Sequence, residues 1–556
     1  MWGALEGVIL PTLRMVGAAL RDHPVVIGAY LVLVLTTLAL LGLTLWRGQA
    51  RRAYWWSVAF ALVSTAFSWG DDTAHHVYRI VALAEEYRAG WPGMLLTNPT
   101  TGQVLPVFVF YSVLPYLPAT FLNLLGMPAW LAFKLLLLGQ FLVLALGLQA
   151  LLDRSRPADA TPARVNVDFM IGILFLQANY VFMLWVGRAA LAELWVYALV
   201  PWVALSILKP GNGRALVALF FVQAVSHPIV LAQALICEIA VPWCIGRLSP
   251  GDFVRRWLGP LAIALLLAAP FWAPQFLWKD FILGPAGFTS VRFEDSFRTL
   301  GGLVHGRDFR SIGPFMPVAL VAAIVAARTR LDLRFWLATG LTVALLVVQW
   351  VGVRDPVSRI PVLNMSVFVW RLMLPTAFLA FGAVLVGWRQ LARPPRGLLQ
   401  AIVLLSAVAM LWASLVNRDT VASRLGNPPD DRTAWVDYDR GRGSFGIIEF
   451  LPRLDRLPAL CPPEGDLQRA SYNELRQGLV AHKSYVAVRD GAYGFVSHGA
   501  PMSACQNDLV LGPVPPGATV RVSERTVNAL FVVRMAELAL LLALSLLFLL
   551  PRRRTP

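Results

Sequence analysis

Charged residues are scarce in this 556-residue chain: Asp, Glu, Lys and Arg make up 14% of it, against about a quarter of a soluble domain. Because 57% of the residues are hydrophobic, the composition excludes an ordinary soluble protein and indicates a polytopic membrane protein. The few charges are unbalanced, with 48 Lys and Arg against 32 Asp and Glu, a net charge of +16. Basic loops that fix membrane orientation explain this excess without a nucleic-acid partner.

Cysteine is also scarce, and four residues are too few for a disulfide scaffold. Cys237 and Cys244 lie in an apolar run, which is typical of small buried packing residues. Cys461 and Cys505 lie in a polar segment that the topology below places outside the cytoplasm. A disulfide between them is left open, because spacing alone does not establish geometry.

Several functional signatures are missing. The sequence has no G-x-x-x-x-G-K-[ST], no H-E-x-x-H and no G-x-S-x-G, so ATP-driven transport, zinc proteolysis and α/β-hydrolase chemistry lack their motifs. Residues 1–24 contain an early acidic residue and an internal Pro and Arg, and they lack a basic start. They therefore indicate an interfacial amphipathic helix and not a cleavable signal peptide.

Apolar runs approaching the length of a spanning helix, about 20 residues, recur along most of the chain. Some of them are short, and we accept these because neighbouring helices would shelter them. The thirteen runs cover residues 25–46, 53–69, 129–151, 168–187, 190–208, 213–227, 229–246, 258–274, 313–327, 335–352, 366–387, 398–416 and 529–550.

The basic loops indicate how these runs are oriented, because Lys and Arg near helix ends stay on the cytoplasmic side. If the runs alternate, the arginine-rich loops between them and the terminal PRRRTP fall on one side. This requires the apolar stretch 104–125 to be re-entrant or to lie along the surface, since another span would reverse every later loop. Its prolines, Pro106, Pro115 and Pro118, favour the same interpretation.

Three segments then lie outside the cytoplasm: 70–128, 275–312 and 417–528. In the last, SYVAVRDGAYGFVS alternates around Asp490-Gly491, a typical hairpin turn, and TVRVSER is a further strand pattern. We predict an all-α polytopic membrane protein with a small extracytoplasmic β-rich domain. Its parts are the interfacial helix 1–24, a transmembrane domain 25–416, the β-rich domain 417–528, and a final helix with a basic cytoplasmic tail, 529–556.

The first outer loop begins with SWGDDTAHHVYRI, where acidic and basic side chains follow an apolar run. Val77, Ile80 and Val81 recur at helical spacing, which predicts a surface helix whose polar side can face a cavity. That side carries mainly Asp72, His75, His76, Arg79 and Glu86. Asp71 or Asp72 either caps this helix or acts as a general base on an acceptor hydroxyl.

Other outer positions also have two interpretations. Arg188 and Glu193, in GRAALAELW, form either an ordinary interfacial ion pair or part of a site. His227 precedes Pro228, so its imidazole either meets a phosphate or satisfies carbonyls that the proline frees. Arg371 either reaches a lipid phosphate or anchors a span at the headgroups.

Charge is dense in the outer loop 275–312, which contains Lys279 and Arg292. This density opposes the orientation bias, and it indicates a phosphate or glycan surface. The competing interpretation is an ordinary glycine-rich loop. Trp91, after the first-loop helix, suits sugar stacking, although tryptophan also marks membrane interfaces generally.

The order of these features resembles the GT-C superfamily of glycosyltransferases, membrane enzymes with an acidic motif in the first outer loop; the DD at Asp71 and Asp72 matches one form of it. The chain is most similar to a bacterial integral-membrane group labelled 6-pyruvoyl-tetrahydropterin synthase-related, a label that we do not take as its activity. The elements that carry the resemblance are DDTAHHVYRIVALAEEYRAGWP, FVFYSVLPYLPA, GRAALAELWVYALVPWVAL, SHPI, VFVWRLMLP and GIIEFLPR. Phe450 departs from the tyrosine expected in the last element, which leaves the role of Glu449 open.

The resemblance implies transfer of a sugar, with inversion, from a polyprenyl-phosphate donor to a glycan, lipid or protein acceptor outside a bacterial plasma membrane, as in cell-envelope polysaccharide biosynthesis. Missing nucleotide-binding segments also favour a lipid-linked donor. Asp71 or Asp72 would be the base, and a divalent metal, Mg or Mn, would be held by Asp71, Asp72 and His76 if one is used. Donor-phosphate candidates are Arg188, His227, Arg371 and Lys279. Acceptor or sugar candidates are His75, His76, Arg79, Trp91, Glu193 and Arg292.

Two other classes remain open from the sequence. A lipid or glycolipid transporter or flippase would also be polytopic with polar groups in the membrane, although we find no repeat between the two halves of the chain. A non-catalytic assembly protein would tolerate substitution of the outer acids and would bind its partners through residues 417–528.

Overall fold

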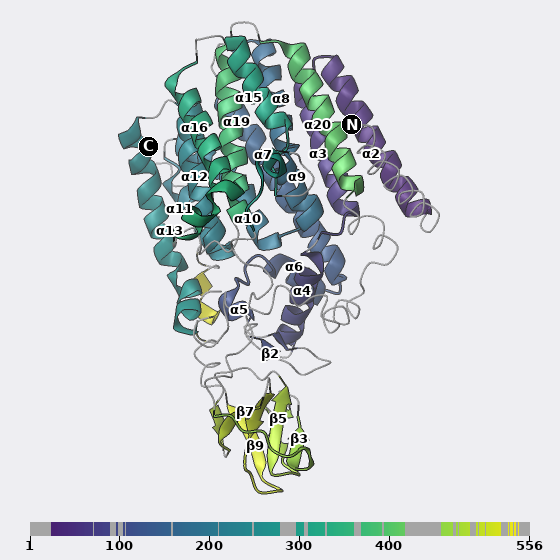
Figure 1. Ribbon diagram of the computed structural model, residues 1–556, viewed down its shortest axis with the longest axis vertical. Helices are drawn as coiled ribbons and strands as arrows, with labels where there is room; N and C mark the ends of the chain where they lie inside the picture. The colour runs from purple at the N-terminus through teal and green to yellow at the C-terminus, as the bar shows by residue number, and fades with distance from the viewer. Residues whose placement is uncertain are drawn as a thin grey trace. The chain divides into compact units, whose positions relative to one another are not determined.

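A computed structural model of the 556-residue chain is mostly helical (Figure 1). The described residues are 24–70, 72–88, 96–97, 104–105, 107–156, 160–209, 211–246, 249–278, 296–304, 310–327, 331–360, 369–391, 394–416, 458–470, 474–475, 478–489, 496–498, 500–505, 508–523 and seven positions between 532 and 543. The predicted interfacial helix lies outside this set, apart from Pro24. The chain divides into two compact units: unit 1 comprises 1–73, 134–264 and 291–429, and unit 2 comprises 74–133, 265–290 and 430–556.

Seven of the described helices are long and apolar enough to cross a membrane. They are α2 (Pro24–Trp46), α7 (Ala129–Arg154), α10 (Leu191–Leu208), α12 (Pro228–Ile245), α13 (Pro250–Trp278), α19 (Met373–Gln390, with the preceding turn from Val369) and α20 (Arg396–Val416). A bent pair of helices, Pro162–Leu176 with Asn179–Arg188, is either an eighth, broken span or a re-entrant loop, and its two parts differ in direction by 52°. The chain therefore has the character of a membrane-spanning protein, and the predicted thirteen spans are not confirmed.

The predicted runs that are not among these helices are too polar, too short, or mostly outside the described residues. α3 (Ala50–Phe67) has Arg51 and Arg52 in its first turn, and these lower its apolar character. α11 (Gly213–Ser226), α15 (Phe315–Ala327) and α16 (Leu333–Val348) are apolar but shorter. Most of the predicted final span, 529–550, lies outside the described residues.

The apolar stretch 104–125 forms short elements, as its prolines favour. β2 (Val104–Leu105) pairs antiparallel with β1 (Leu96–Thr97), and α5 (Val107–Phe110) and α6 (Leu117–Leu124) follow. No helix in this stretch is long enough to span a membrane, judged on its described residues.

Unit 1 is a bundle of helices around α19, in which every residue from Met373 to Trp388 is buried. α19 packs against α8 (Pro162–Leu176), α12, α15 and α16 (Figure 1). At the end of this helix, Arg389 donates to both carboxylate oxygens of Asp168, at 2.9 and 2.8 Å. Arg389 also donates to Ser155, so it joins α19 to α8 and to the end of α7.

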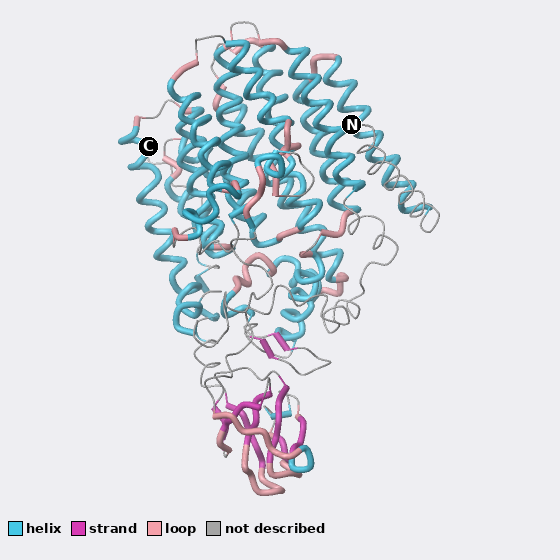
Figure 2. The backbone as a smooth tube through the Cα atoms, viewed as in Figure 1, coloured by secondary structure: helices cyan, strands magenta, loops and turns pink. Residues whose placement is uncertain are grey.

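The strands near the C-terminus belong to unit 2 and form two sheets (Figure 2). One has the order β3-β5-β8-β7 and the other β4-β9-β6. The strands are β3 (Leu467–Arg469), β4 (Leu479–Val480), β5 (Tyr485–Arg489), β6 (Val496–His498), β7 (Met502–Cys505), β8 (Asp508–Leu511) and β9 (Thr519–Ser523).

The hairpin predicted around Asp490-Gly491 is wrong, although strands lie on both sides of this dipeptide in the sequence. β5 pairs in parallel with β3 on one edge and antiparallel with β8 on the other, so it has no edge left for β6. β6 pairs with β9 in the second sheet. Local alternation identified the strands but not their partners, because pairing is settled by contacts distant in sequence.

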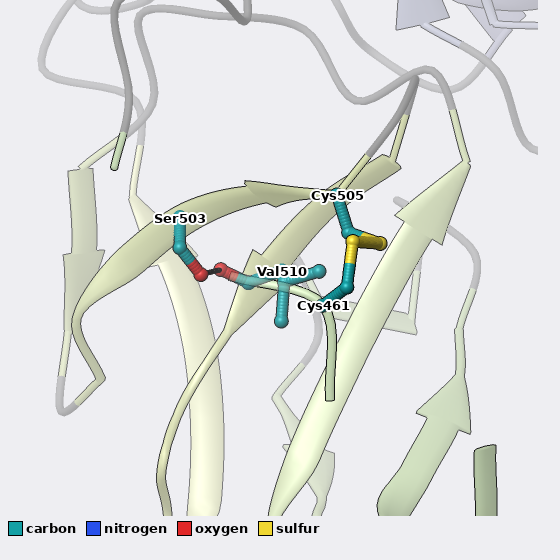
Figure 3. The surroundings of a disulfide bond; sticks show 4 residues. All are labelled: Cys461, Ser503, Cys505 and Val510. Carbon is teal, nitrogen blue, oxygen red and sulfur yellow. Dashed lines mark hydrogen bonds between the residues drawn. A yellow bond between two sulfur atoms is a disulfide. The ribbon is translucent and has the colours of Figure 1, made fainter. Parts of the chain in front are cut away.

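The structure forms the Cys461–Cys505 disulfide that the sequence left open (Figure 3). Cys505 ends β7, where Ser503 Oγ donates to the carbonyl oxygen of Val510 in the neighbouring strand β8. The bond closes a segment with a sequence separation of 44 residues. It therefore ties residues before β3 to the edge of the first sheet.

Candidate functional site

The segment that follows α3 is pressed onto the backbone of residues 188 and 189. A Cβ atom on Gly70 would lie 2.6 Å from the carbonyl carbon of Arg188 and 2.7 Å from the Cβ atom of Ala189. Two residues later, the Asp72 amide donates to the Arg188 carbonyl oxygen at 2.9 Å. Only glycine permits this close approach, so Gly70 sets where Asp72 meets Arg188.

The surface that receives this segment is an irregular helix break. α9 (Asn179–Met183) continues into a π-helical turn, η1 (Leu184–Arg188), and Ala189 then takes a left-handed conformation with φ of 59°. α10 begins at Leu191. π-helical turns and left-handed non-glycine residues are rare and gather at functional sites. This break places Arg188 and Glu193, five residues apart, within contact of one another.

Arg188 bridges two carboxylates of unit 1. Its Nε lies 3.1 Å from Asp72 Oδ2. Its Nη1 and Nη2 donate to Glu193 Oε2 and Oε1 at 2.5 and 3.1 Å, in the two-pronged geometry that suits a guanidinium. The pair is buried, and Arg188 also contacts the Asp72 carboxylate.

Glu193 collects two further groups from distant parts of the chain. Arg371 Nη2, at the start of the α19 span, lies 2.8 Å from Glu193 Oε1. His227 Nε2 lies 3.9 Å from the same oxygen. His227 also caps α12, because its Nδ1 accepts from the Val230 amide at 3.4 Å. Nδ1 is then unprotonated, and the Nε2 that faces Glu193 carries the ring proton.

An aromatic ring lies among the cations. The guanidinium carbons of Arg188, Arg310 and Arg371 lie 4.8, 5.9 and 5.9 Å from the centre of the Trp370 ring. Trp370 is buried in η6 (Val369–Leu372). Cations over a desolvated indole face are attracted by its negative π-system, so Trp370 stabilises three positive charges close to one another.

Exposure distinguishes the two carboxylates. The side chain of Asp72 is 30% exposed, whereas that of Glu193 is 2% exposed. Asp72 is therefore partly accessible, and Glu193 is the buried counter-ion of Arg188 and Arg371. Glu193 was a candidate for acceptor or sugar binding, and that role stays a prediction.

In unit 2, the predicted first-loop helix is present as α4 (Thr73–Arg88), but its polar side does not face open space. His76, Arg79 and Glu86 are buried. His76 Nδ1 lies 2.7 Å from the Tyr116 hydroxyl, and Arg79 Nη1 donates to the same hydroxyl at 2.9 Å. The predicted helix is thus present, and its polar side is covered at His76 and Arg79, because both contact Tyr116.

The same cluster shows what Arg79 contacts. Its guanidinium carbon lies 4.4 Å from the centre of the Tyr111 ring, and the His76 ring stacks on Phe133. His75, on the same helix, is half-buried. The structure therefore joins His76 and Arg79 to aromatic residues of the segment 107–133, all within unit 2.

Four candidates lie outside the described residues: Asp71, Trp91, Lys279 and Arg292. Within the described part of the chain, no group of three or more His, Cys, Asp or Glu side chains could hold a metal ion. His76 is engaged by Tyr116 and Asp72 by Arg188. These described residues do not by themselves fit the predicted metal set, so metal binding stays a prediction that also involves Asp71, and no step below uses it.

Sequence reasoning did not single out three residues that shape this site, and it included Arg310 only as part of the charge-dense loop 275–312. Gly70 and Ala189 carry no chemical signal, and Trp370 is one of 20 tryptophans. Arg310 lies near Trp370. The next residue, Ser311, is fixed by Asn179, whose Nδ2 donates to Ser311 Oγ at 2.8 Å. Two of these residues had a signal: Trp370 lies beside Arg371 in the VFVWRLMLP element, and Arg310 lies in the charge-dense loop 275–312.

Comparisons with protein-family models and with curated protein sequences find no match for this chain. The geometry of the site and the order of the sequence elements are therefore the observations on which a function can be built.

Proposed function

We propose that this protein is an integral membrane glycosyltransferase of the GT-C type. It transfers a sugar from a polyprenyl-phosphate donor to a glycan, lipid or protein acceptor on the outer face of a bacterial plasma membrane, with inversion. The observation that most supports this proposal is the environment of Asp72. Its partly exposed carboxylate contacts Arg188, which is itself paired with the buried Glu193, and these residues lie beside the ends of apolar helices.

Asp72 is the general base of the proposed reaction. Arg188 Nε contacts Oδ2, so Oδ1 is the oxygen that receives the proton of the acceptor hydroxyl. The acceptor oxygen then forms a bond to the anomeric carbon while the bond from that carbon to the phosphate oxygen breaks. Polyprenyl phosphate leaves with the bonding electrons, and attack from the opposite side inverts the configuration.

The leaving phosphate gains negative charge, and the described part of the site carries more cations than carboxylates to meet it. Among the described residues, three guanidinium groups lie near Trp370, and the carboxylates of Asp72 and Glu193 contact Arg188 and Arg371. A partly desolvated surplus of positive charge stabilises a developing anion more than water does. We assign the phosphate end of the donor to the Arg371 and Arg310 side of Trp370, because Arg188 already bridges both carboxylates.

A transporter or flippase is the second candidate, and one observation favours it. Glu238 of α12 is fully buried inside a candidate span, and its Oε1 accepts from Gln223 Nε2 at 2.5 Å. Ionisable groups inside a membrane often mark transport pathways. The proposed transfer reaction does not use Glu238.

The test uses purified full-length protein in lipid nanodiscs with a panel of polyprenyl-phosphate sugars, candidate acceptors and divalent metal. Release of polyprenyl phosphate with a glycosylated product of inverted configuration is expected. Movement of a fluorescent lipid-linked sugar between leaflets, with no release of polyprenyl phosphate from any donor, would replace the transferase with the transporter.

A further inference from the structure

Lys134 lies buried in the apolar helix α7, with 5% of the residue exposed. Its ammonium group donates to the carbonyl oxygen of Thr65 at 3.0 Å and to that of Ser68. Thr65 lies in the last turn of α3, which ends at Phe67, and Ser68 is the residue that caps this end. A cation is favoured at the C-terminal end of a helix because it satisfies carbonyls that have no partner within the helix.

The same ammonium group faces an aromatic ring. Lys134 Nζ lies 5.3 Å from the centre of the Trp69 ring, and Trp69 is itself buried. Ionisable side chains inside an apolar helix are costly, and they are retained mainly where they serve a site. No carboxylate among the described residues forms an ion pair with Lys134, which contacts two carbonyl groups and the Trp69 ring.

The contacts of Lys134 lie a few residues before Asp72. At one end of the segment, Lys134 fixes the carbonyl of Ser68, whose amide donates back to Ser64 at 3.0 Å. At the other end, Gly70 and the Asp72 amide are docked on residues 188 and 189. The short connection between them is thus held at both ends, once by α7 and once by the turn before α10.

We propose that Lys134 is a positioning residue for Asp72. It pins the end of α3 so that residues 68–72 reach Arg188 with the Asp72 carboxylate turned to the acceptor. This assignment rests on the proposed transferase function for its catalytic consequence. Its structural consequence, the docking of residues 68–72, can be measured without any activity.

Hydrogen exchange of the full-length protein in nanodiscs tests the docking. Lys134→Met keeps the length and the apolar stem but removes the donors. We expect the amides of Ser68, Asp72 and Thr73 to exchange about tenfold faster or more, because their local opening becomes easier. Unchanged exchange in the peptides that cover residues 64–75 would overturn the proposal.

Arg389→Met is the matched control. It removes another cation of unit 1, a partly buried one that holds Asp168 and Ser155 far from Asp72 in the sequence. We expect it to lower overall stability at least as much as Lys134→Met, yet to leave exchange at residues 68–73 unchanged. Equal acceleration in both variants would mean general loosening and would also overturn the proposal.

Activity supplies the second readout. Lys134→Met should lower kcat about tenfold or more, since misplacing a catalytic group is costly, while KM for the donor stays near its wild-type value. Lys134→Arg, which keeps the charge and the donors, should recover part of kcat and of the exchange protection. Should Lys134→Met not accumulate as folded protein, Lys134→Gln takes its place in both measurements.

The outcomes separate this proposal from the function on which it rests. A wild-type protein without turnover would reject the transferase, and the exchange experiment would still decide whether Lys134 holds residues 68–72. An active wild type with unchanged kcat in Lys134→Met, together with unchanged exchange, would reject only the positioning role.

Discussion

Asp72 and Glu193 carry the same chemical group, and their surroundings give them different roles. Asp72 keeps one side open and has a single ion-pair partner, Arg188, among the described residues. Glu193 is almost fully buried between Arg188 and Arg371, with His227 close by. A buried carboxylate with two cations is part of the framework, whereas a partly exposed one with one cation can exchange a proton with a substrate.

Glu193→Gln should therefore destabilise the protein strongly. The substitution removes the carboxylate that contacts the buried guanidinium of Arg371. It also removes one of the two carboxylates that contact Arg188. Removing one partner of a buried ion pair costs about 3–5 kcal/mol. Thermal unfolding in detergent measures this loss, with Asp72→Asn as the control, for which a loss below about 1 kcal/mol is expected. Equal stability of Glu193→Gln and the wild type would show that this network is not structural.

At the scale of elements, the contact between the α3–α4 connection and the turn before α10 is the feature that builds the site. Helical periodicity predicted both flanking helices of each connection, but a π-helical turn and a left-handed alanine leave no periodic pattern in a sequence. Five residues on a regular helix would have placed Arg188 and Glu193 on different faces. The break in the helix is what brings them together.

Gly70→Ala tests that contact. The new Cβ atom would meet the backbone of Arg188 at 2.6 Å, so the connection has to move away. A cost of about 1–3 kcal/mol in unfolding free energy and a large loss of turnover are expected, measured by thermal unfolding and by donor cleavage. Ala189→Gly is the matched change, since it relieves a left-handed alanine and should be neutral or stabilising by up to about 1 kcal/mol. If the Gly70→Ala variant had the stability and the turnover of the wild type, the docked geometry would be contradicted.

For α4 and the strands too, local sequence patterns predicted the elements but not their contacts. Spacing correctly predicted a helix after Asp72 and strands on both sides of Asp490-Gly491. It could not show that Tyr116, about 40 residues later, covers His76 and Arg79, nor that β5 pairs with β3 and β8. Local patterns encode the elements, and the partners depend on long-range packing.

At the scale of the whole molecule, a helical membrane protein with a small strand region was predictable from composition and hydropathy. The site was predictable only as separate ambiguous residues. Arg188, His227 and Arg371 each had an ordinary structural interpretation, and only the packing of α10, α12 and the α19 span gathers them around Glu193. The ion pairs of the site thus join residues that are far apart in the sequence, and they depend on how these helices pack.

Removing the disulfide tests whether the strand region can lose stability while the helices of unit 1 keep theirs. Cys461→Ser with Cys505→Ser removes a link across 44 residues, which should cost about 2–4 kcal/mol in the stability of that region. The helices of unit 1 should be unaffected. Limited proteolysis, followed by mapping of the cleavage sites, is expected to show faster cutting within residues 458–523 only. Unchanged cutting there would indicate that the strands hold without the bond.

The most direct measurement compares Asp72→Asn with the wild type at saturating lipid-linked donor. Asparagine keeps the size and a contact to Arg188 but cannot take a proton from the acceptor, so turnover should fall about 100-fold or more. Donor binding and the unfolding temperature should remain close to wild type. Full activity in Asp72→Asn would contradict Asp72 as the base.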